Sequence, residues 1–137
     1  MYNSPRPLKK SNQTLECGIA VIQDEKGRIL ISKRRYSDSY GGYWEFPGGK
    51  KRPSETFEEC VIREAHEELG IHISIKQFLK KIDYRYPDHP VSLHFYLCHL
   101  EEGEPRCGIC EECKWVFPKE CEKETFLPAS LPILALL

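Results

Sequence analysis

Two short apolar runs near the start of the chain flank a polar tetrapeptide that contains glycine. The first run covers residues 17–23, the second covers residues 28–32, and residues 24–27 lie between them. Apolar runs joined by so short a glycine-containing segment predict a β-hairpin. A basic triplet at residues 33–35 follows the second predicted strand.

The strongest helical pattern in the chain covers residues 54–69. Its apolar side chains recur every four residues, at Phe57, Val61, Ala65 and Leu69. This spacing gives the helix one buried stripe along a single face. Ser54 and Thr56 are residues that cap a helix N-terminus, and Gly70 is typical of a helix end. The pattern therefore predicts an amphipathic helix that ends at Gly70.

The second half of the chain has the pattern of β-strands. Strands are expected at residues 71–75, 82–86, 91–97 and 115–117. The apolar tail, residues 126–137, contains two prolines, and we expect it to form a C-terminal helix packed on the sheet. These elements predict one α/β domain over residues 14–137, after a loose lead-in over residues 1–13.

The charges of the chain are nearly balanced, with 20 Lys and Arg against 21 Asp and Glu and a net charge of −1. This balance excludes a globally basic protein that coats a nucleic-acid polymer, so an anionic ligand must meet a local basic cluster. Residues 33–35 and 50–52 are such clusters. No apolar run reaches the ~18–20 residues that span a bilayer, and the first ten residues lack the apolar core of a signal peptide. We therefore expect a cytoplasmic protein without membrane contact, either a monomer or a homodimer.

The chain has seven cysteines, an odd number, and no export signal, so a disulfide framework is not expected. Cys107, Cys110 and Cys113 differ from the others because they are separated by two-residue gaps, as in thiolate metal sites. One interpretation is a structural zinc ion with a fourth ligand from Cys121, Cys98 or His99. The other, which we favour, is that these cysteines are free and mostly reduced.

Three glutamates, Glu64, Glu67 and Glu68, lie within an arc of roughly 100° on the last two turns of the predicted helix. Each like-charged pair at this spacing costs ~0.2–0.5 kcal/mol, and the helix dipole disfavours anions at this end. The arrangement becomes favourable if a divalent cation binds there, because Mg²⁺ prefers carboxylate oxygen and water. The alternative is a solvated acidic face.

Seven residues decide between these interpretations, because their identities and their spacing resemble the Nudix box. The residues are Gly49, Glu55, Arg63, Glu64, Glu67, Glu68 and Gly70. The resemblance extends over roughly residues 15–137. It implies an α/β/α sandwich with a mixed sheet, a loop–helix segment that carries the box, and a C-terminal helix. It also implies a hydrolase of nucleoside diphosphates linked to another group, with a small-molecule nucleotide substrate and Mg²⁺ as cofactor, for which Mn²⁺ can substitute.

By the same resemblance, the metal ligands are the carbonyl of Gly48 and the carboxylates of Glu64, Glu67 and Glu68. Glu55 and Arg63 complete the implied catalytic set. Arg63 is expected to act as a salt-bridge partner that orients the loop and the helix. The pair Gly48-Gly49 allows the backbone to approach metal and phosphate closely, because no Cβ intrudes.

Residues 43–50, 84–88 and 126–133 look like the MutT branch of the family, whose members remove oxidised guanine nucleotides. This match implies a nucleotide site formed by Arg34, Ser39, Glu45, Phe46, Pro47, Gly48, Tyr86, Asp88 and Ser130. The aromatic side chains of Phe46 and Tyr86 offer flat faces to a purine, or are core residues. The expected activity is that of an 8-oxo-dGTP diphosphatase.

Three positions depart from the MutT pattern. Ser130 replaces an asparagine that reads the oxidised base, and its single hydroxyl cannot make a bidentate contact. His89 replaces an arginine, and Ile109 stands where a loop glutamate is expected, with Glu111 and Glu112 as the nearest substitutes. Two alternatives therefore stay open: a pyrophosphohydrolase of cytidine nucleotides, whose branch has aspartate at the position of Ser130, and a non-catalytic module that recognises a nucleobase.

Overall fold

The computed structural model describes residues 13–87 and 89–137, so the predicted lead-in falls almost wholly outside the described residues. Seven strands belong to one sheet: β1 (Leu15–Gln23), β2 (Ile29–Lys33), β3 (Trp44–Glu45), β4 (Gly48–Lys50), β5 (His72–Tyr86), β6 (His89–Glu102) and β7 (Glu112–Val116). The hairpin expected at the start of the chain is β1–β2, whose turn is closed by a hydrogen bond from the Gly27 N–H to the Asp24 carbonyl.

The sheet is mixed, as expected. Its main path runs β3-β2-β1-β6-β5, with β4 paired to β1 and β7 paired to β2. The long ladder between β1 and β6 is parallel, whereas the other ladders are antiparallel. Residues 17–22 of β1 are buried on both faces, because β1 lies between β2 and β6 inside this sheet.

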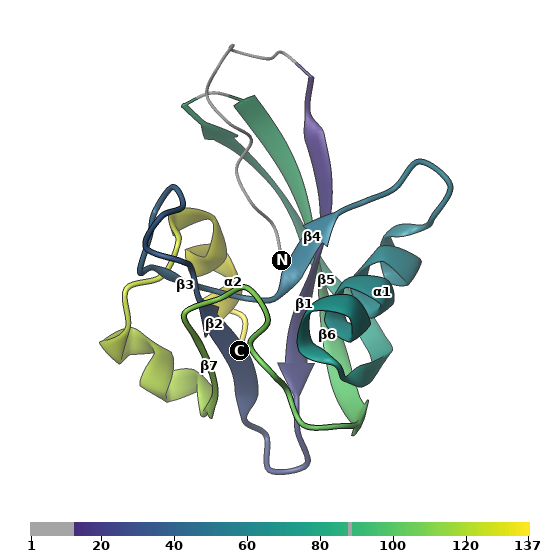
Figure 1. Cartoon of the computed structure of the whole chain (residues 1–137), viewed down its shortest axis with the longest axis vertical. Coiled ribbons are helices and arrows are strands. Elements are labelled where there is room, and N and C mark those ends of the chain that lie inside the picture. The colour runs from purple at the N-terminus through teal and green to yellow at the C-terminus, as the bar shows by residue number, and fades with distance from the viewer. Residues whose placement is uncertain (1–12, 88) are drawn as a thin grey trace.

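Two separate apolar cores cover the two faces of the sheet. One core contains side chains of helix α1 (Phe57–Leu69), namely Val61, Ala65 and Leu69. The other contains Phe126, Ala129 and Ile133 from the C-terminal segment. Figure 1 shows α1 and the C-terminal elements on opposite sides of the sheet. This arrangement confirms the expected α/β/α sandwich.

Helix α1 has the ends that its sequence predicts. The Thr56 hydroxyl accepts a hydrogen bond from the Glu59 N–H, and the Glu59 carboxylate accepts one from the Thr56 N–H, which completes a capping box. Gly70 ends the helix in a left-handed conformation (φ 69°), which glycine adopts without steric cost.

The C-terminal segment is less helical than expected. A 3₁₀ helix, η1 (Pro118–Lys123), precedes it, and its own helical part is limited to η2 (Pro128–Ser130) and one turn of α-helix, α2 (Leu131–Leu134). Phe126 instead forms a bridge to Trp44 of β3. Pro132, which lacks a backbone N–H, keeps η2 from continuing as an α-helix, and it lies instead in the first turn of α2, where proline is tolerated. Among the described residues, no helix is long and apolar enough to cross a membrane.

Candidate active site

The glycine pair of the predicted box lies on β4, directly beside β1. Gly49 is opposite Gly18, and Gly48 is opposite Ile19. A Cβ atom on Gly49 would overlap the carboxylate of Glu64, and one on Gly48 would overlap the carbonyl of Gly18. Gly48 therefore requires glycine, because the backbone of β1 leaves no room for a side chain. A side chain at position 49 would instead displace the Glu64 carboxylate.

Arg63 is the hub of the predicted catalytic set. Its guanidinium donates to both carboxylate oxygens of Glu55, at 2.6 and 2.9 Å. Its Nη1 donates to Glu64 Oε1 at 2.9 Å and to Glu67 Oε1 at 3.1 Å. The Lys50 carbonyl accepts a further bond at 3.1 Å, so that the side chain connects the glycine loop with the helix. This geometry agrees with the orienting salt bridge that the resemblance implies.

These contacts change the ionisation of both partners. Hydrogen bonds from Arg63, with a further one from the Arg52 N–H, lower the pKa of Glu55 to about 2. Hydrogen bonding to Glu55, Glu64 and Glu67 raises the pKa of Arg63 above its usual range. Both groups are therefore ionised at neutral pH, and the salt bridge keeps its full charge.

The predicted metal ligands suit a hard cation in kind, because carboxylates and a backbone carbonyl are the oxygen donors that Mg²⁺ takes. The close packing of Gly49 against Glu64 also keeps one carboxylate next to the glycine backbone. In the conformation seen here, within residues 13–87 and 89–137, no three acidic, histidine or cysteine side chains converge closely enough to hold an ion. In this conformation Arg63 is the partner of one oxygen of Glu64 and one of Glu67. The ligand set therefore stays a prediction.

A small cavity of about 20 Å³ lies on the other face of the sheet. Four of the predicted nucleotide-site residues line it, together with five apolar residues. The four are Glu45, Phe46, Tyr86 and Ser130, and the apolar residues are Ile19, Leu93, Phe95, Leu127 and Ala129. The cavity is about the size of one water molecule, so a nucleobase can enter only if its walls move apart.

Both aromatic side chains of this cavity are buried, Phe46 at 2% and Tyr86 at 3% exposure. The Phe46 ring packs on Phe95 and Phe126. The Tyr86 ring stacks on the His89 ring, with 5.7 Å between the ring centroids. The two interpretations of these residues are thus compatible, because both side chains belong to the core and also line the cavity. His89, which departs from the MutT pattern, is buried behind Tyr86.

A buried ion pair joins Arg34 to this cavity. Arg34 Nη1 donates to Glu45 Oε1 at 3.1 Å, and Arg34 Nε donates to the Ser39 carbonyl at 2.8 Å. Burial raises the pKa of Glu45 to about 7, against the opposing effect of the Arg34 charge. Near neutral pH, Glu45 is therefore divided between a carboxylate that accepts hydrogen bonds and a carboxyl that also donates one.

The remaining predicted residues lie apart from the cavity lining. Ser39 contacts the site only through its backbone carbonyl, which accepts the bond from Arg34, and the residue itself is exposed to solvent. The Pro47 carbonyl accepts a bond from the Ala20 N–H, which ties the segment between β3 and β4 to β1. Asp88 lies outside the described residues. The apolar lining residues were not predicted, although the alternation of Leu93 and Phe95 along β6 is a signal that both face the same side.

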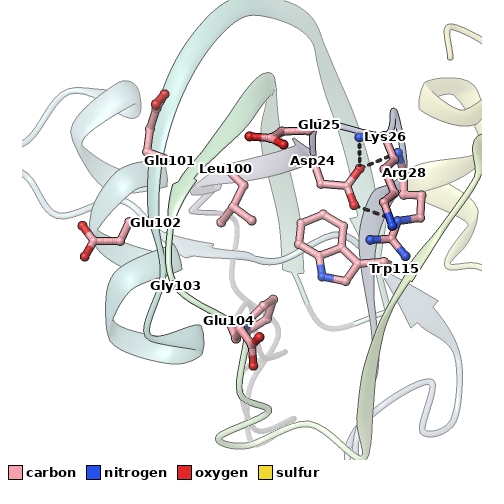
Figure 2. Close-up of a pocket in the computed structure, with 11 residues that line it drawn as sticks. Asp24, Glu25, Lys26, Arg28, Leu100, Glu101, Glu102, Gly103, Glu104 and Trp115 are labelled. Carbon is pink, nitrogen blue, oxygen red and sulfur yellow. Dashed lines mark hydrogen bonds and ion pairs between the residues drawn. The ribbon is translucent and has the colours of Figure 1, made fainter.

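A larger cavity of about 340 Å³ lies between the β1–β2 turn and the end of β6 (Figure 2). Trp115 and Leu100 line it, and Asp24 pairs there with Arg28 at 2.7 Å. Its lining contains five acidic side chains and two basic ones. This excess of negative charge opposes a polyphosphate, and none of the predicted site residues lines the cavity. The smaller cavity beside Glu45 is the candidate nucleotide site, because four of the predicted residues line it.

The cysteine loop differs from both interpretations of its sequence. Cys107 and Cys110 form a disulfide, so the expectations of free thiols and of a zinc site are wrong for these two residues. The two-residue gap brings their Cα atoms to 5.4 Å, within the range that a disulfide spans. Cys113 has a free thiol, as expected. Ile109 is exposed, and the Glu111 carboxylate accepts a hydrogen bond from the Tyr36 N–H at 3.4 Å.

The comparisons with known proteins agree on one family. A family model described as NUDIX domain matches residues 18–136. The 8-oxo-dGTP diphosphatase of Escherichia coli K12 is 32% identical over 123 residues, which are 90% of this chain and 95% of that protein. The CTP pyrophosphohydrolase of the same strain is 28% identical over 116 residues, 85% of this chain and 86% of that protein.

A solved structure agrees with both the sequence relatives and the fold. The crystal structure of a MutT Nudix hydrolase from Burkholderia pseudomallei matches with a TM-score of 0.79 and 29% identity, covering 90% of this chain and 98% of that chain. The predicted family, its MutT-like character and the predicted class of enzyme are confirmed. The chain belongs to the Nudix family, as a MutT-like hydrolase of phosphoric anhydrides.

Proposed function

We propose that this chain is a Mg²⁺-dependent nucleoside triphosphate pyrophosphohydrolase that releases a nucleoside monophosphate and pyrophosphate, with 8-oxo-dGTP as its substrate. The observation that carries this proposal is the hub at Arg63, which holds Glu55, Glu64 and Glu67 together beside the glycine loop. Acidic side chains gathered near a helix C-terminus are unfavourable by themselves. A cation-dependent reaction on a polyphosphate gives them a function.

Four groups hold the cation in this proposal, with Mn²⁺ as a possible substitute for Mg²⁺: the Gly48 carbonyl and the carboxylates of Glu64, Glu67 and Glu68. When bound, the cation neutralises charge on the diphosphate and lowers the pKa of a water molecule. Glu67 has the most freedom to turn away from Arg63, since its side chain is 47% exposed. Glu55 stays on Arg63 through two hydrogen bonds and keeps the loop and helix in register.

We propose that the nucleotide is bound by residues around the small cavity and its entrance: Arg34, Ser39, Glu45, Phe46, Pro47, Gly48, Tyr86, Asp88 and Ser130. The Ser130 hydroxyl and the Glu45 carboxyl are both buried and line the same cavity. An asparagine amide offers a hydrogen-bond donor and an acceptor side by side, which a single serine hydroxyl cannot replace. The Ser130 hydroxyl and the Glu45 carboxyl together offer both. The oxidised guanine edge presents an N–H beside a carbonyl, which this pair of groups complements.

The test is the kcat/KM of the purified chain on four nucleotides with Mg²⁺: 8-oxo-dGTP, dGTP, CTP and 5-methyl-dCTP, with the phosphorus products identified. We expect pyrophosphate as product and a preference for 8-oxo-dGTP over dGTP of about 100-fold or more, the size of discrimination that buried polar groups provide. Glu68→Gln, measured in parallel, is the control that assigns the turnover to this chain. Equal rates on 8-oxo-dGTP and dGTP would overturn the substrate assignment.

A cytidine nucleotide is the second candidate substrate. Two observations favour it: Ser130 is not the asparagine of the MutT pattern, and a CTP pyrophosphohydrolase is among the relatives. Ser130→Asn and Ser130→Asp separate the two candidates. Gain of 8-oxo-dGTP turnover in the first variant, with a wild type that prefers CTP, would assign the cytidine branch. Binding of a nucleotide without turnover, with Mg²⁺ or Mn²⁺, would instead indicate a non-catalytic recognition module.

The proposed setting of the enzyme follows from the same properties. A small nucleotide substrate and a net charge of −1 favour a cytoplasmic enzyme that acts on the nucleotide pool, without binding a nucleic-acid polymer. We propose that residues 14–137 act as one domain, as a monomer or a homodimer. Sedimentation equilibrium of the full chain distinguishes these two states.

A further inference from the structure

The segment from Gly103 to Glu111, here called the strap, lies across the C-terminal end of helix α1. The Arg106 N–H donates to the Leu69 carbonyl at 3.0 Å. A Cβ atom on Gly103 would lie 3.0 Å from the Gly70 carbonyl oxygen, and one on Gly108 would lie 3.1 Å from the Glu68 carbonyl oxygen. The strap therefore touches the helix end at three points, one of which is the backbone of a proposed metal ligand.

The far end of the strap is attached to β2 and the loop that follows it. The Glu111 N–H donates to the Lys33 carbonyl at 2.9 Å, and the Tyr36 N–H donates to the Glu111 carboxylate at 3.4 Å. Lys33 directly precedes Arg34 of the buried ion pair. Figure 1 shows this segment running from the end of β6 past α1 to β7. The strap thus connects the metal side of the proposed site with its nucleotide side.

The disulfide between Cys107 and Cys110 lies in the middle of the strap. Both residues are only partly buried, whereas Cys17, Cys98 and Cys121 are at most 1% exposed. Burial raises the pKa of the Cys17 and Cys98 thiols to about 12, which keeps them unreactive. Exchange with a thiol in solution is therefore directed to the strap and to Cys113, which is also partly buried.

We propose that Cys107 and Cys110 are a reversible thiol–disulfide modification site that sets the order of the strap and, through it, the turnover of the Nudix site. This proposal rests on the proposed function, because its effect is on that active site. The exchange partner is a low-molecular-weight disulfide such as glutathione disulfide. One thiolate attacks it and releases one glutathione, and the second thiol displaces the other, so that two electrons and two protons pass from the cysteines to two glutathione molecules.

The two redox states differ in how firmly the helix end is held. In the disulfide state, the closed four-residue ring limits the conformations between Arg106 and Glu111, and both anchoring hydrogen bonds are kept. In the dithiol state, the ring opens and the anchors form less often. The helix end that carries Glu68 then moves relative to β2, and we expect kcat/KM to fall by about three- to tenfold, the usual range for a change transmitted to a site through packed neighbours.

The experiment equilibrates the full chain in glutathione buffers of graded ratio and labels it with N-ethylmaleimide for mass spectrometry. Amide hydrogen exchange and kcat/KM are measured on the same samples. We expect Cys107 and Cys110 to be labelled only in reducing buffers, and the Arg106 and Glu111 amides to exchange about tenfold faster there. Cys107→Ser should show the fast exchange and the lower kcat/KM in every buffer. Cys113→Ser is the matched control, and it should respond as the wild type does.

Two results would overturn the proposal. The first is labelling of Cys107 and Cys110 at every glutathione ratio, which would mean that the disulfide does not form. The second is equal exchange and equal kcat/KM in both redox states, which would mean that the disulfide does not govern the strap. Absence of turnover in both states, with exchange of Arg106 and Glu111 still redox-dependent, would support the modification site and count against the proposed function instead.

Discussion

Two arginine–glutamate pairs of this protein have the same charges but opposite effects on their carboxyl groups. In the pair Arg34–Glu45, the side chains are 2% and 7% exposed, and the pKa of Glu45 rises to about 7. In the pair Arg63–Glu55, they are 16% and 11% exposed, and the pKa of Glu55 falls to about 2. The presence of an arginine therefore does not decide the ionisation of its partner.

The difference comes from the balance between desolvation and hydrogen bonding. Glu55 accepts two bonds from Arg63 and one from the Arg52 N–H, and this pair, called the surface pair below, keeps partial contact with solvent. Glu45 is fully enclosed, and the single bond from Arg34 Nη1 does not offset the loss of water. The ionisation of the interior pair, Arg34–Glu45, thus affects the stability of the fold. The surface pair, Arg63–Glu55, serves mainly to position the catalytic helix.

Replacing the arginine of the interior pair has the largest expected effect. Arg34→Met leaves the Glu45 carboxylate buried without its partner and removes the bond to Ser39. We expect the free energy of unfolding at pH 8 to fall by about 3–5 kcal/mol, the usual cost of breaking a buried pair. At pH 6 the loss should be smaller, because Glu45 can take up a proton. Urea denaturation at the two pH values measures both quantities.

The same replacement in the surface pair is the matched control. Arg63→Met should lower the free energy of unfolding less than Arg34→Met does, because Arg63 and Glu55 keep some contact with solvent and water can replace part of the lost bonds. Its main effect should be on turnover, because Glu55 and Glu64 lose their common partner. Equal destabilisation by the two variants would contradict the distinction between a folding pair and a positioning pair.

The pH dependence of stability gives the next largest effect. The pKa of Glu45 is raised on folding, so the native state binds more protons and the stabilisation is complete below about pH 4.5. It is lost as the pH rises through about 7. A shift from 4.5 to about 7 corresponds to about 3 kcal/mol. Urea denaturation from pH 5 to pH 8 should show this decline in the wild type and a flatter profile in Glu45→Gln.

An exposed glutamate provides the comparison for that profile. Glu101→Gln changes the same functional group at the surface and should keep the wild-type decline. A Glu45→Gln profile as steep as that of the wild type would assign the pH dependence to other groups.

The carboxylates beside the surface pair should affect turnover and not folding. Glu68→Gln is expected to lower kcat by about 100-fold or more, equivalent to about 3 kcal/mol of barrier. The thermal midpoint should stay within a few degrees, because the charge it removes lies among like charges. Glu58→Gln, on the first turn of the same helix, is the control and should keep its turnover. Full activity of Glu68→Gln would exclude this residue from the metal site.

Much of the fold and of the surface pair could be predicted from the sequence. The four-residue apolar period and Gly70 predict helix α1, because helix geometry converts local spacing directly into distance. The salt bridge between Arg63 and the loop that contains Glu55 was implied by the resemblance to the Nudix box. Spacing alone does not give this contact, since Glu55 precedes the helix.

The interior pair and the disulfide were beyond such reasoning. Arg34 and Glu45 meet because β2 and β3 pair in one particular register, and the depth of the pair depends on β3, a strand of two residues without a pattern of its own. Cys107 and Cys110 had the spacing of a metal site as well as of a disulfide. The spacing alone does not distinguish these two outcomes, and the structure shows the disulfide.

Acid titration of the surface pair has the smallest expected effect and the opposite sign to that of Glu45. The pKa of Glu55 is lowered on folding, so its stabilisation is present above about pH 4.5 and is lost as the pH falls through about 2. We expect this effect to be smaller than that of Glu45, because Glu55 keeps some contact with solvent. The urea midpoint between pH 5 and pH 3 should therefore fall less in Glu55→Gln than in the wild type. Glu25→Gln, on the exposed β1–β2 turn, should keep the wild-type slope. If Glu55→Gln has this same slope, the charge of Glu55 does not stabilise the folded protein through Arg63.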